Sequence, residues 1–269
     1  MDDSVKYLVI GNPARHSLSP AMQNAAFDFF GEGTPYSFRE LTAEELPDFA
    51  AEARSSLKGF NITAPFKQRI IPLCDVVNEE AREADSVNTV KIIGGKLYGY
   101  TTDGYGFLEA MRTALHIEPA GRNFMILGAG GAANAIAREL KNDGASDIVI
   151  VNRTREKAEK LADSVGGRVG EAAEAPEMDC VINCTALGLK PGDDSPLDAA
   201  LVVRCKAVFD AVYLPTRLQQ LARDANVRVA DGRLMLLYQG ARAFEIWTGH
   251  AAPLVKMQLA LNRELEARK

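Results

Sequence analysis

A glycine-rich segment near the middle of the chain has the spacing of a dinucleotide-binding loop. It reads Gly128-Ala129-Gly130-Gly131-Ala132-Ala133 and follows the apolar run 123–127. Gly128 would permit a tight turn, Gly130 would let the backbone approach a pyrophosphate, and Ala133 would let helix and strand pack closely. Free N–H groups and the helix dipole would then hold the diphosphate. We therefore predict a dinucleotide site at residues 128–132, the alternative being a purely structural turn.

The end of the next apolar run indicates which dinucleotide is bound. An NAD enzyme usually has an acidic residue there, about 20 residues after the glycines, to hold the ribose 2′-hydroxyl. This chain instead has Asn152, Arg153 and Thr154, and Lys157 lies on the first turn of the following helix. Charge-assisted hydrogen bonds to a 2′-phosphate contribute roughly 1.5–3 kcal/mol each. These donors predict NADP rather than NAD, the alternative being a solvated basic helix start.

Small polar residues gather at predicted strand ends and loops in the first half of the chain. Open α/β sheets bind ligands at the carboxyl ends of their strands. Neutral donors with one lysine and one aspartate suit a small polyhydroxylated molecule, although each residue alone is more commonly a cap or turn residue. Their joint placement predicts a substrate site. The set is Ser17, Ser19, Asn61, Thr63, Lys67, Asn88, Thr89 and Asp103.

Alternating strand-like and helix-like segments must position these residues. In the first half we expect strands at 7–10, 36–41 and 59–63, and a hairpin of 87–93 and 96–100 around Gly94-Gly95. Helices are expected at 20–30, with Ser19 as N-cap, and at 42–54, with Thr42 and Glu45 in a capping box.

The second half continues the alternation of strands and helices. Strands are expected at 123–127, 147–151, 180–183 and 207–210, and helices at 131–140, 155–165, 233–247 and 253–268. This pattern predicts an α/β fold with two domains. The first is an α/β domain with a mainly parallel sheet, and the second is a Rossmann-like NADP domain. The junction is expected near residues 102–106.

The order of these motifs resembles the shikimate/quinate dehydrogenase family over almost the whole chain. The resemblance implies reversible reduction of 3-dehydroshikimate to shikimate by NADPH, in the chorismate pathway of aromatic amino-acid biosynthesis. It implies a catalytic domain of residues 1–103, completed by the helices of 239–269, around an NADP domain of 104–238. The matching segments are 17–20, 61–67, 87–89, 102–104, 128–132, 152–154, 231–232 and 235–239.

The resemblance also assigns roles by position. Lys67 and Asp103 would be the catalytic pair. A lysine ammonium stabilises the negative charge that hydride transfer builds on a ketone oxygen, and it can donate the proton. A neighbouring carboxylate raises a lysine pKa, so Lys67 as acid/base and Lys67 as electrostatic anchor both stay open. The implied substrate contacts are Ser17, Ser19, Asn61, Thr63, Lys67, Asn88, Asp103, Tyr213 and Gln239. Glu79, Ala211 and Gly232 would touch the cofactor.

Several residues depart from the family pattern. Thr101 stands where the family often has Asn, and Leu234 stands where it often has Gly. The segment 213–217 is shorter than the usual Tyr-x-Pro-x-x-Thr-Pro. Lys157 replaces a common Arg, which keeps the charge but loses the bidentate fork. Ser19 resembles shikimate-selective members, whereas quinate users often carry Thr; one methyl changes selectivity by only about 1–3 kcal/mol.

Three alternatives follow from these features. The chain could be a quinate/shikimate or related cyclic hydroxyacid dehydrogenase of the same family. The glycine loop alone would also permit a non-catalytic NADP-binding sensor. A hydrophobic stripe that binds a partner protein could be formed by Trp247, Met235 and Leu236. Such residues at helical spacing more commonly pack in a core.

Composition limits the remaining classes of function. The 269 residues are 47% hydrophobic and 25% charged, which is typical of ordinary globular proteins. With a net charge of −5, we do not expect the protein to bind nucleic acid through its overall electrostatic field. Residues 1–4 lack the basic start of a secretory signal, and no apolar run approaches the length of a membrane span. Cys180, Cys184 and Cys205 lie in apolar stretches, which favours reduced, buried thiols. We expect a cytoplasmic monomer or homodimer without a metal, membrane or nucleic-acid partner.

Overall fold

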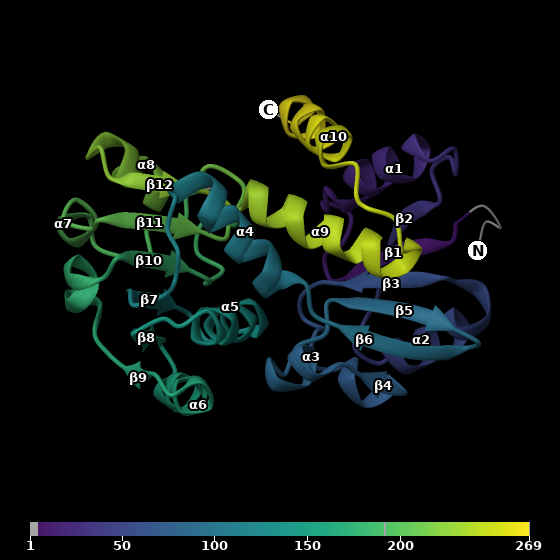
Figure 1. The fold of residues 1–269 in the computed structure, drawn as a ribbon, viewed down its shortest axis with the longest axis horizontal. Helices are drawn as coiled ribbons and strands as arrows, with labels where there is room; N and C mark the ends of the chain where they lie inside the picture. Colours follow the sequence, from purple (N-terminus) through teal and green to yellow (C-terminus); the bar gives the residue numbers. More distant parts are fainter. Residues whose placement is uncertain (1–4, 191, 269) are drawn as a thin grey trace. The chain divides into compact units, whose positions relative to one another are not determined.

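The computed structural model describes residues 5–190 and 192–268, so residues 1–4, which bear on the secretory-signal expectation, lie outside it. The chain divides into two compact units, each described by itself (Figure 1). The first comprises Met1–Thr102 with Leu237–Lys269, and the second comprises Asp103–Leu236. Within the described ranges, none of the helices has the length and apolar character needed to cross a membrane.

The first unit contains a six-stranded mixed sheet of order β2-β1-β3-β5-β6-β4 (Figure 1). β1 pairs in parallel with β2 and β3, β5 is antiparallel to β3 and β6, and β4 is parallel to β6. The hairpin predicted around Gly94-Gly95 is therefore confirmed as β5 and β6. The strands are β1 Tyr7–Gly11, β2 Tyr36–Glu40, β3 Gly59–Ile62, β4 Val76–Val77, β5 Thr89–Ile93 and β6 Lys96–Tyr100.

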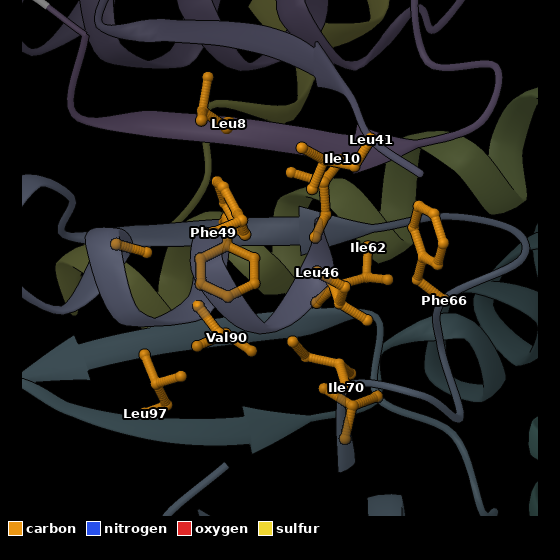
Figure 2. Packing of buried hydrophobic residues seen from close by; sticks show 14 of the residues in the cluster. Leu8, Ile10, Leu41, Leu46, Phe49, Ile62, Phe66, Ile70, Val90 and Leu97 are labelled. Atoms are coloured by element: carbon orange, nitrogen blue, oxygen red, sulfur yellow. The ribbon is translucent and has the colours of Figure 1, made fainter. Parts of the chain in front are cut away.

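One face of this sheet packs against a helix of the first unit. Alternation along β1 sends Leu8 and Ile10 to the face covered by α2, where they pack in one cluster with Phe49 (Figure 2). On the same face Phe49 meets Phe60 edge to face at 5.1 Å. The unit's helices are α1 Ser19–Phe29, α2 Leu46–Ser56, α3 Glu79–Glu83, α10 Leu254–Ala267 and the 3-10 turn η1 Ile71–Leu73; α9 Gly232–Thr248 begins in the second unit.

The opposite face carries an aromatic cluster. Tyr7 of β1 stacks on Phe27 of α1 at 4.6 Å and contacts Trp247 of α9 at 5.0 Å. Trp247 and Met235 are only 6% and 8% exposed, so their predicted packing role is confirmed and they offer no surface stripe for a partner. Trp247 also donates its Nε1 hydrogen to the carbonyl of Val90 at 2.9 Å, which ties α9 to the sheet.

The second unit is built on a six-stranded, fully parallel sheet of order β9-β8-β7-β10-β11-β12. This is the 3-2-1-4-5-6 order of a Rossmann sheet, as the strand–helix alternation predicted. The strands are β7 Asn123–Leu127, β8 Asp147–Val151, β9 Arg168–Val169, β10 Cys180–Asn183, β11 Ala207–Asp210 and β12 Arg228–Ala230.

Helices of the second unit cover both faces of its sheet. Phe107 of α4 meets Phe209 edge to face on one side, and Leu218 of α8 packs with Val181 and Val208 on the other. Cys180 and Cys205 are buried as predicted, whereas Cys184 is half-buried. The helices are α4 Asp103–Leu115, α5 Gly131–Asn142, α6 Arg155–Val165, α7 Ala199–Val202, α8 Arg217–Asp224 and the 3-10 turn η2 Ala172–Glu177.

Two helix starts differ from the prediction. Ser19 is the first residue of α1 rather than its N-cap, which is Leu18. The second helix begins at Leu46, although Thr42 N does donate to Glu45 Oε2 at 2.7 Å in the preceding turn. Pro47 explains this later start, because a proline lacks the N–H that a helix interior requires and fits only in the first turn.

Candidate active site

The sheet of the first unit has a topological switch point beside β1. The chain leaves β1 towards β2 on one side, and β3 joins on the other, which is where open α/β sheets bind ligands. The loops after β1 and β3 are joined, because Asn12 N donates to the carbonyl of Ala64 at 3.1 Å. A Cβ at Gly11 would lie 2.2 Å from Thr63 Cγ2, so only glycine permits this approach. Half-buried Lys67 follows in the second of these loops.

Predicted substrate residues from distant parts of the first unit form one hydrogen-bonded network. Asn61 Nδ2 donates to the carbonyl of Asn88 at 3.1 Å and to Thr89 Oγ1 at 3.0 Å. Asn88 Nδ2 donates to Thr102 Oγ1 at 2.9 Å and to Gln239 Oε1 at 3.4 Å. The structure therefore brings Asn61, Asn88 and Gln239 together, and adds Thr102 as the residue that fixes the Asn88 amide.

Gln239 lies on α9, which is anchored directly after that residue and again further along the helix. Gln23 Nε2 donates to the carbonyl of Gly240 at 2.8 Å, and a Cβ at Gly240 would lie 2.1 Å from Met22 Cε. Further along the helix, Lys91 Nζ donates to the carbonyl of Ile246 at 2.6 Å. These contacts fix the axial position of α9 and thereby the position from which Gln239 reaches the network.

The loop that carries Ser17 and leads to Ser19 at the start of α1 is held by a carboxylate that the sequence did not single out. Glu40, the last residue of β2, accepts hydrogen bonds from the backbone N–H groups of Ala14 and Arg15 at 3.1 and 3.2 Å. The Arg15 guanidinium pairs with the same carboxylate and lowers the pKa of Glu40 to about 2. Ser19 N donates to Ser17 Oγ at 3.2 Å, so the two serines belong to one local turn.

In the second unit, the glycine loop leaves β7 beside the end of β10. Gly128 has φ +109°, and a Cβ there would lie 3.1 Å from the carbonyl carbon and oxygen of Cys184. Gly130 is the N-cap of α5, and no described atom lies within 4 Å of its Cβ position. The backbone at Gly130 is therefore free of side-chain contacts, and the N–H groups of a helix's first turn point out from its N-terminus, as an anion site requires.

The segment after β8 presents cationic and polar donors. Asn152 Nδ2 donates to the carbonyl of Thr154 at 2.8 Å and shapes the turn into α6. Arg153, Thr154 and Lys157 are exposed. Among the described ion pairs, Arg155 binds Glu159 at 2.8 Å, but none involves Arg153 or Lys157. This turn can therefore offer two cations to an anionic ligand.

A buried carboxylate organises the edge formed by β10 and β11. Asp210 accepts hydrogen bonds from Asn183 Nδ2, Val212 N, Thr216 Oγ1 and Gln219 Nε2 at 2.9, 3.1, 2.6 and 3.1 Å. Burial raises the pKa of Asp210 above its ordinary value. The network fastens both ends of the segment 211–216, so the shortened family segment is an ordered structure here.

Three predicted residues lie on or against that segment. Ala211 directly follows Asp210, and a Cβ at Gly232 would lie 2.2 Å from the carbonyl oxygen of Ala211 and 3.1 Å from Tyr213 N. Half-buried Tyr213 sits in the middle of the segment. The structure thus brings Ala211, Tyr213 and Gly232 together at the carboxyl edge of the sheet.

Three further predicted residues lie on other elements of the two units. Exposed Glu79 begins α3 in the first unit. Lys67 belongs to the first unit, and buried Asp103 is the first residue of α4 in the second. The pairing of Lys67 with Asp103 and the cofactor contact of Glu79 stay predictions. Over the ranges that the structure describes, no three His, Cys, Asp or Glu side chains are grouped so as to hold a metal ion.

Family models match three stretches of the chain. Residues 9–90 match the shikimate dehydrogenase substrate binding domain, 112–187 match shikimate/quinate 5-dehydrogenase, and 232–261 match the shikimate 5′-dehydrogenase C-terminal domain. The first and last matches fall in the two sequence segments that make up the first unit, apart from the start of α9, and the middle match falls in the second unit.

Individual relatives match over nearly the full length. The shikimate dehydrogenase (NADP(+)) of Methanopyrus kandleri is 39% identical, over 96% of this chain and 94% of the relative. The crystal structure of shikimate dehydrogenase from Aquifex aeolicus superposes with a TM-score of 0.92 at 36% identity, covering 97% and 98% of the two chains. The Thermus thermophilus enzyme, solved in complex with NADP(H) and shikimate, gives 0.89 at 37% identity, covering 97% and 99%. With this identity over nearly its whole length, the chain belongs to the shikimate dehydrogenase family.

Proposed function

We propose that the protein catalyses the NADP-dependent, reversible reduction of 3-dehydroshikimate to shikimate, a step of chorismate and aromatic amino-acid biosynthesis. The observation that carries the proposal is the network of Asn61, Asn88 and Gln239 at a sheet switch point, in a chain that also carries an open glycine loop on a Rossmann sheet. The Thermus thermophilus relative of the same fold, which binds NADP(H) and shikimate, supports it.

The proposal divides the chain by role. Residues 1–103, completed by 239–269, form the substrate domain, and residues 104–238 form the NADP-binding domain. The two compact units, with boundaries at 102–103 and 236–237, support this division. The final helices return to the first hundred residues, since Gln239 hydrogen-bonds with Asn88.

The residues of the second unit fit NADP. The open space above Gly130 admits a pyrophosphate to the N–H groups of α5, and Arg153 with Lys157 supplies positive charge for a 2′-phosphate. The bound cofactor supplies the hydride. We assign cofactor contacts to Glu79, Gly128, Ala129, Gly130, Gly131, Ala132, Asn152, Arg153, Thr154, Lys157, Ala211 and Gly232.

The substrate residues divide by chemistry. The hydroxyls of Ser17 and Ser19 would donate to the substrate carboxylate, while amide and hydroxyl groups would bind the ring hydroxyls. The Lys67 ammonium would stabilise the charge that develops on the carbonyl oxygen and would deliver the proton. Asp103 would orient Lys67. The ring-hydroxyl set is Asn61, Thr63, Asn88, Tyr213 and Gln239.

Lys67 gives the direct test of the proposed function. Lys67→Ala should lower kcat for shikimate oxidation by roughly 10²–10⁴-fold while NADP still binds, because general acid–base or electrostatic catalysis contributes on that scale. Exposed Arg69 lies two residues further on, and Arg69→Ala is the matched control. A non-catalytic NADP-binding sensor predicts instead that Lys67→Ala changes nothing measurable.

The pH profile separates the two roles of Lys67. If Lys67 transfers the proton, Lys67→Ala removes one limb of the pH dependence of kcat. If it is an electrostatic anchor, Lys67→Arg keeps much of the activity with an unchanged profile. Assays of shikimate and quinate with NADP and NAD test the substrate, and equal or better turnover of quinate with NAD would overturn the proposal.

We also propose a cytoplasmic location and a monomer or homodimer. The cytoplasmic location is supported by reduced thiols, since the four cysteines are free and Cys180 and Cys205 are buried. Cell fractionation and light scattering of the purified protein test the two points separately.

A further inference from the structure

Tyr36, the first residue of β2, places its hydroxyl against a predicted substrate residue. The side chain is only 2% exposed, and its O–H donates to Asn61 Oδ1 at 2.7 Å. One buried hydroxyl therefore connects the start of β2 with the end of β3.

The position of this hydroxyl is fixed from several directions. Asn24 of α1 clamps the backbone of Tyr36, since its Nδ2 donates to the Tyr36 carbonyl and its Oδ1 accepts from the Tyr36 N–H, both at 2.9 Å. The ring lies 6.0 Å from that of Trp247. Tyr36 also pairs in register with Tyr7 of β1. The ring has little freedom, so its hydroxyl acts as a fixed point of the site.

This fixed point determines which way the Asn61 amide faces. Both Nδ2 hydrogens are used, because they reach the carbonyl of Asn88 and the hydroxyl of Thr89. Asn61 Oδ1 accepts the hydrogen of the Tyr36 hydroxyl with one of its two lone pairs. The second lone pair is the only hydrogen-bonding capacity of the amide that these bonds leave unused. Asn61 can therefore offer a ligand an acceptor and no donor, which suits a substrate hydroxyl.

The same hydroxyl stays a donor to Asn61. A tyrosine hydroxyl has one hydrogen, and Tyr36 gives it to Asn61. Burial raises the pKa of Tyr36 well above its ordinary value, so the group stays a donor at physiological pH.

We propose that Tyr36 is a positioning residue of the substrate site, whose hydroxyl orients Asn61 as an acceptor for a substrate hydroxyl. The identity of the substrate rests on the proposed function. Tyr36 itself acts through the Asn61 side chain.

Tyr36→Phe tests the proposal because it removes one oxygen and keeps the ring. We expect KM for shikimate to rise roughly 10-fold, the effect of about one lost hydrogen bond, with kcat and KM for NADP changed less than about twofold. Tyr7→Phe is the matched control, since Tyr7 is 3% exposed in the same aromatic cluster and pairs with Tyr36. It should leave all three constants unchanged.

A double-mutant cycle with Asn61→Ala excludes a merely structural effect. If Tyr36 acts through Asn61, the double variant raises KM for shikimate by less than the product of the single effects. A folded Tyr36→Phe protein with unchanged KM, or strictly multiplicative effects, would overturn the proposal. If Tyr36→Phe does not fold, Asn24→Ala replaces it, because it loosens the backbone of Tyr36 and should raise the same KM.

Calorimetric titration separates this proposal from the proposed function. Wild-type protein that fails to oxidise shikimate with NADP contradicts the proposed function alone. Titration of shikimate into the wild-type and Tyr36→Phe proteins needs no turnover, and a lower affinity in the variant supports the positioning role. Equal affinities in these two proteins contradict that role.

Discussion

The hydroxyl of Thr216 donates a 2.6 Å hydrogen bond to the buried carboxylate of Asp210, and the same hydroxyl accepts from Gln219 N at 3.1 Å. Thr216 is thus both a partner of the anion and the N-cap of α8. The bond ties the far end of the segment 211–216 back to the end of β11. Since Tyr213 and Ala211 lie within that segment, its conformation depends on a pair of residues that touch neither proposed ligand.

Thr216→Val should destabilise the protein by about 1–3 kcal/mol. It keeps the shape of the side chain but removes a cap and leaves one oxygen of a buried carboxylate with one partner fewer. Urea unfolding measures the change. Thr216→Ser retains the hydroxyl and should lower the free energy of unfolding much less. An equal decrease in the two variants would show that the hydrogen bond to Asp210 contributes nothing to stability.

Two glycines of the cofactor loop should respond differently to alanine. Gly130→Ala should fold with an unchanged melting temperature, because the site is open and the backbone there is extended, yet it should weaken NADP binding at least about 10-fold. Gly128→Ala should lower the melting temperature, because a residue with φ +109° and a carbonyl 3.1 Å away resists a side chain. Fluorescence titration with NADPH and thermal unfolding provide both readouts; a stable Gly130→Ala protein with full affinity would refute the assignment of the loop.

Arg153→Ala should reduce affinity for NADP by roughly 10- to 100-fold and leave affinity for NAD unchanged. The guanidinium would contact only the 2′-phosphate, and such charge-assisted bonds contribute roughly 1.5–3 kcal/mol. Arg155→Ala is the control, because Arg155 is already paired with Glu159. Parallel loss of NAD and NADP affinity in Arg153→Ala would argue against a 2′-phosphate site.

The Glu40 carboxylate should make stability depend on pH in acid. Its pKa falls from 4.5 to about 2 through the Arg15 hydrogen bonds, so the folded state favours the ionised form. This contribution is complete above the unfolded pKa and is lost as pH falls towards about 2. The stability difference between wild type and Glu40→Gln should therefore shrink between pH 4.5 and 2. Urea unfolding across this range measures it, and Arg15→Gln should abolish most of the same pH dependence.

Much of the fold follows from local patterns. Alternating and continuous apolar runs located β7, β8, β10 and β11, and the Gly94-Gly95 pair located the hairpin. The glycine loop was predictable because its function requires special backbone conformations over adjacent residues. Polar motifs at strand ends likewise identified Asn61 and Asn88, while the family resemblance identified Gln239, and the structure joins the three in one network.

Other features depend on contacts that no local pattern contains. Ser19 has the residue type and position of an N-cap, yet α1 begins at Ser19 itself and its N-cap is Leu18. Glu40 and Asp210 read as ordinary strand-end acids, and only the arrangement of the loops makes them anchors.

The sequence by itself thus determined the main strands and helices, the hairpin and the glycine loop, because periodicity and turn chemistry act over a few residues. Only the tertiary structure decided which groups orient the polar residues at the strand ends. Hydrogen bonds between Tyr36 and Asn61, or between Gln23 and Gly240, join segments 25 and 217 positions apart. Such hydrogen-bonded pairs form only after the sheet and helices have packed, because packing brings the two partners together and shields them from water.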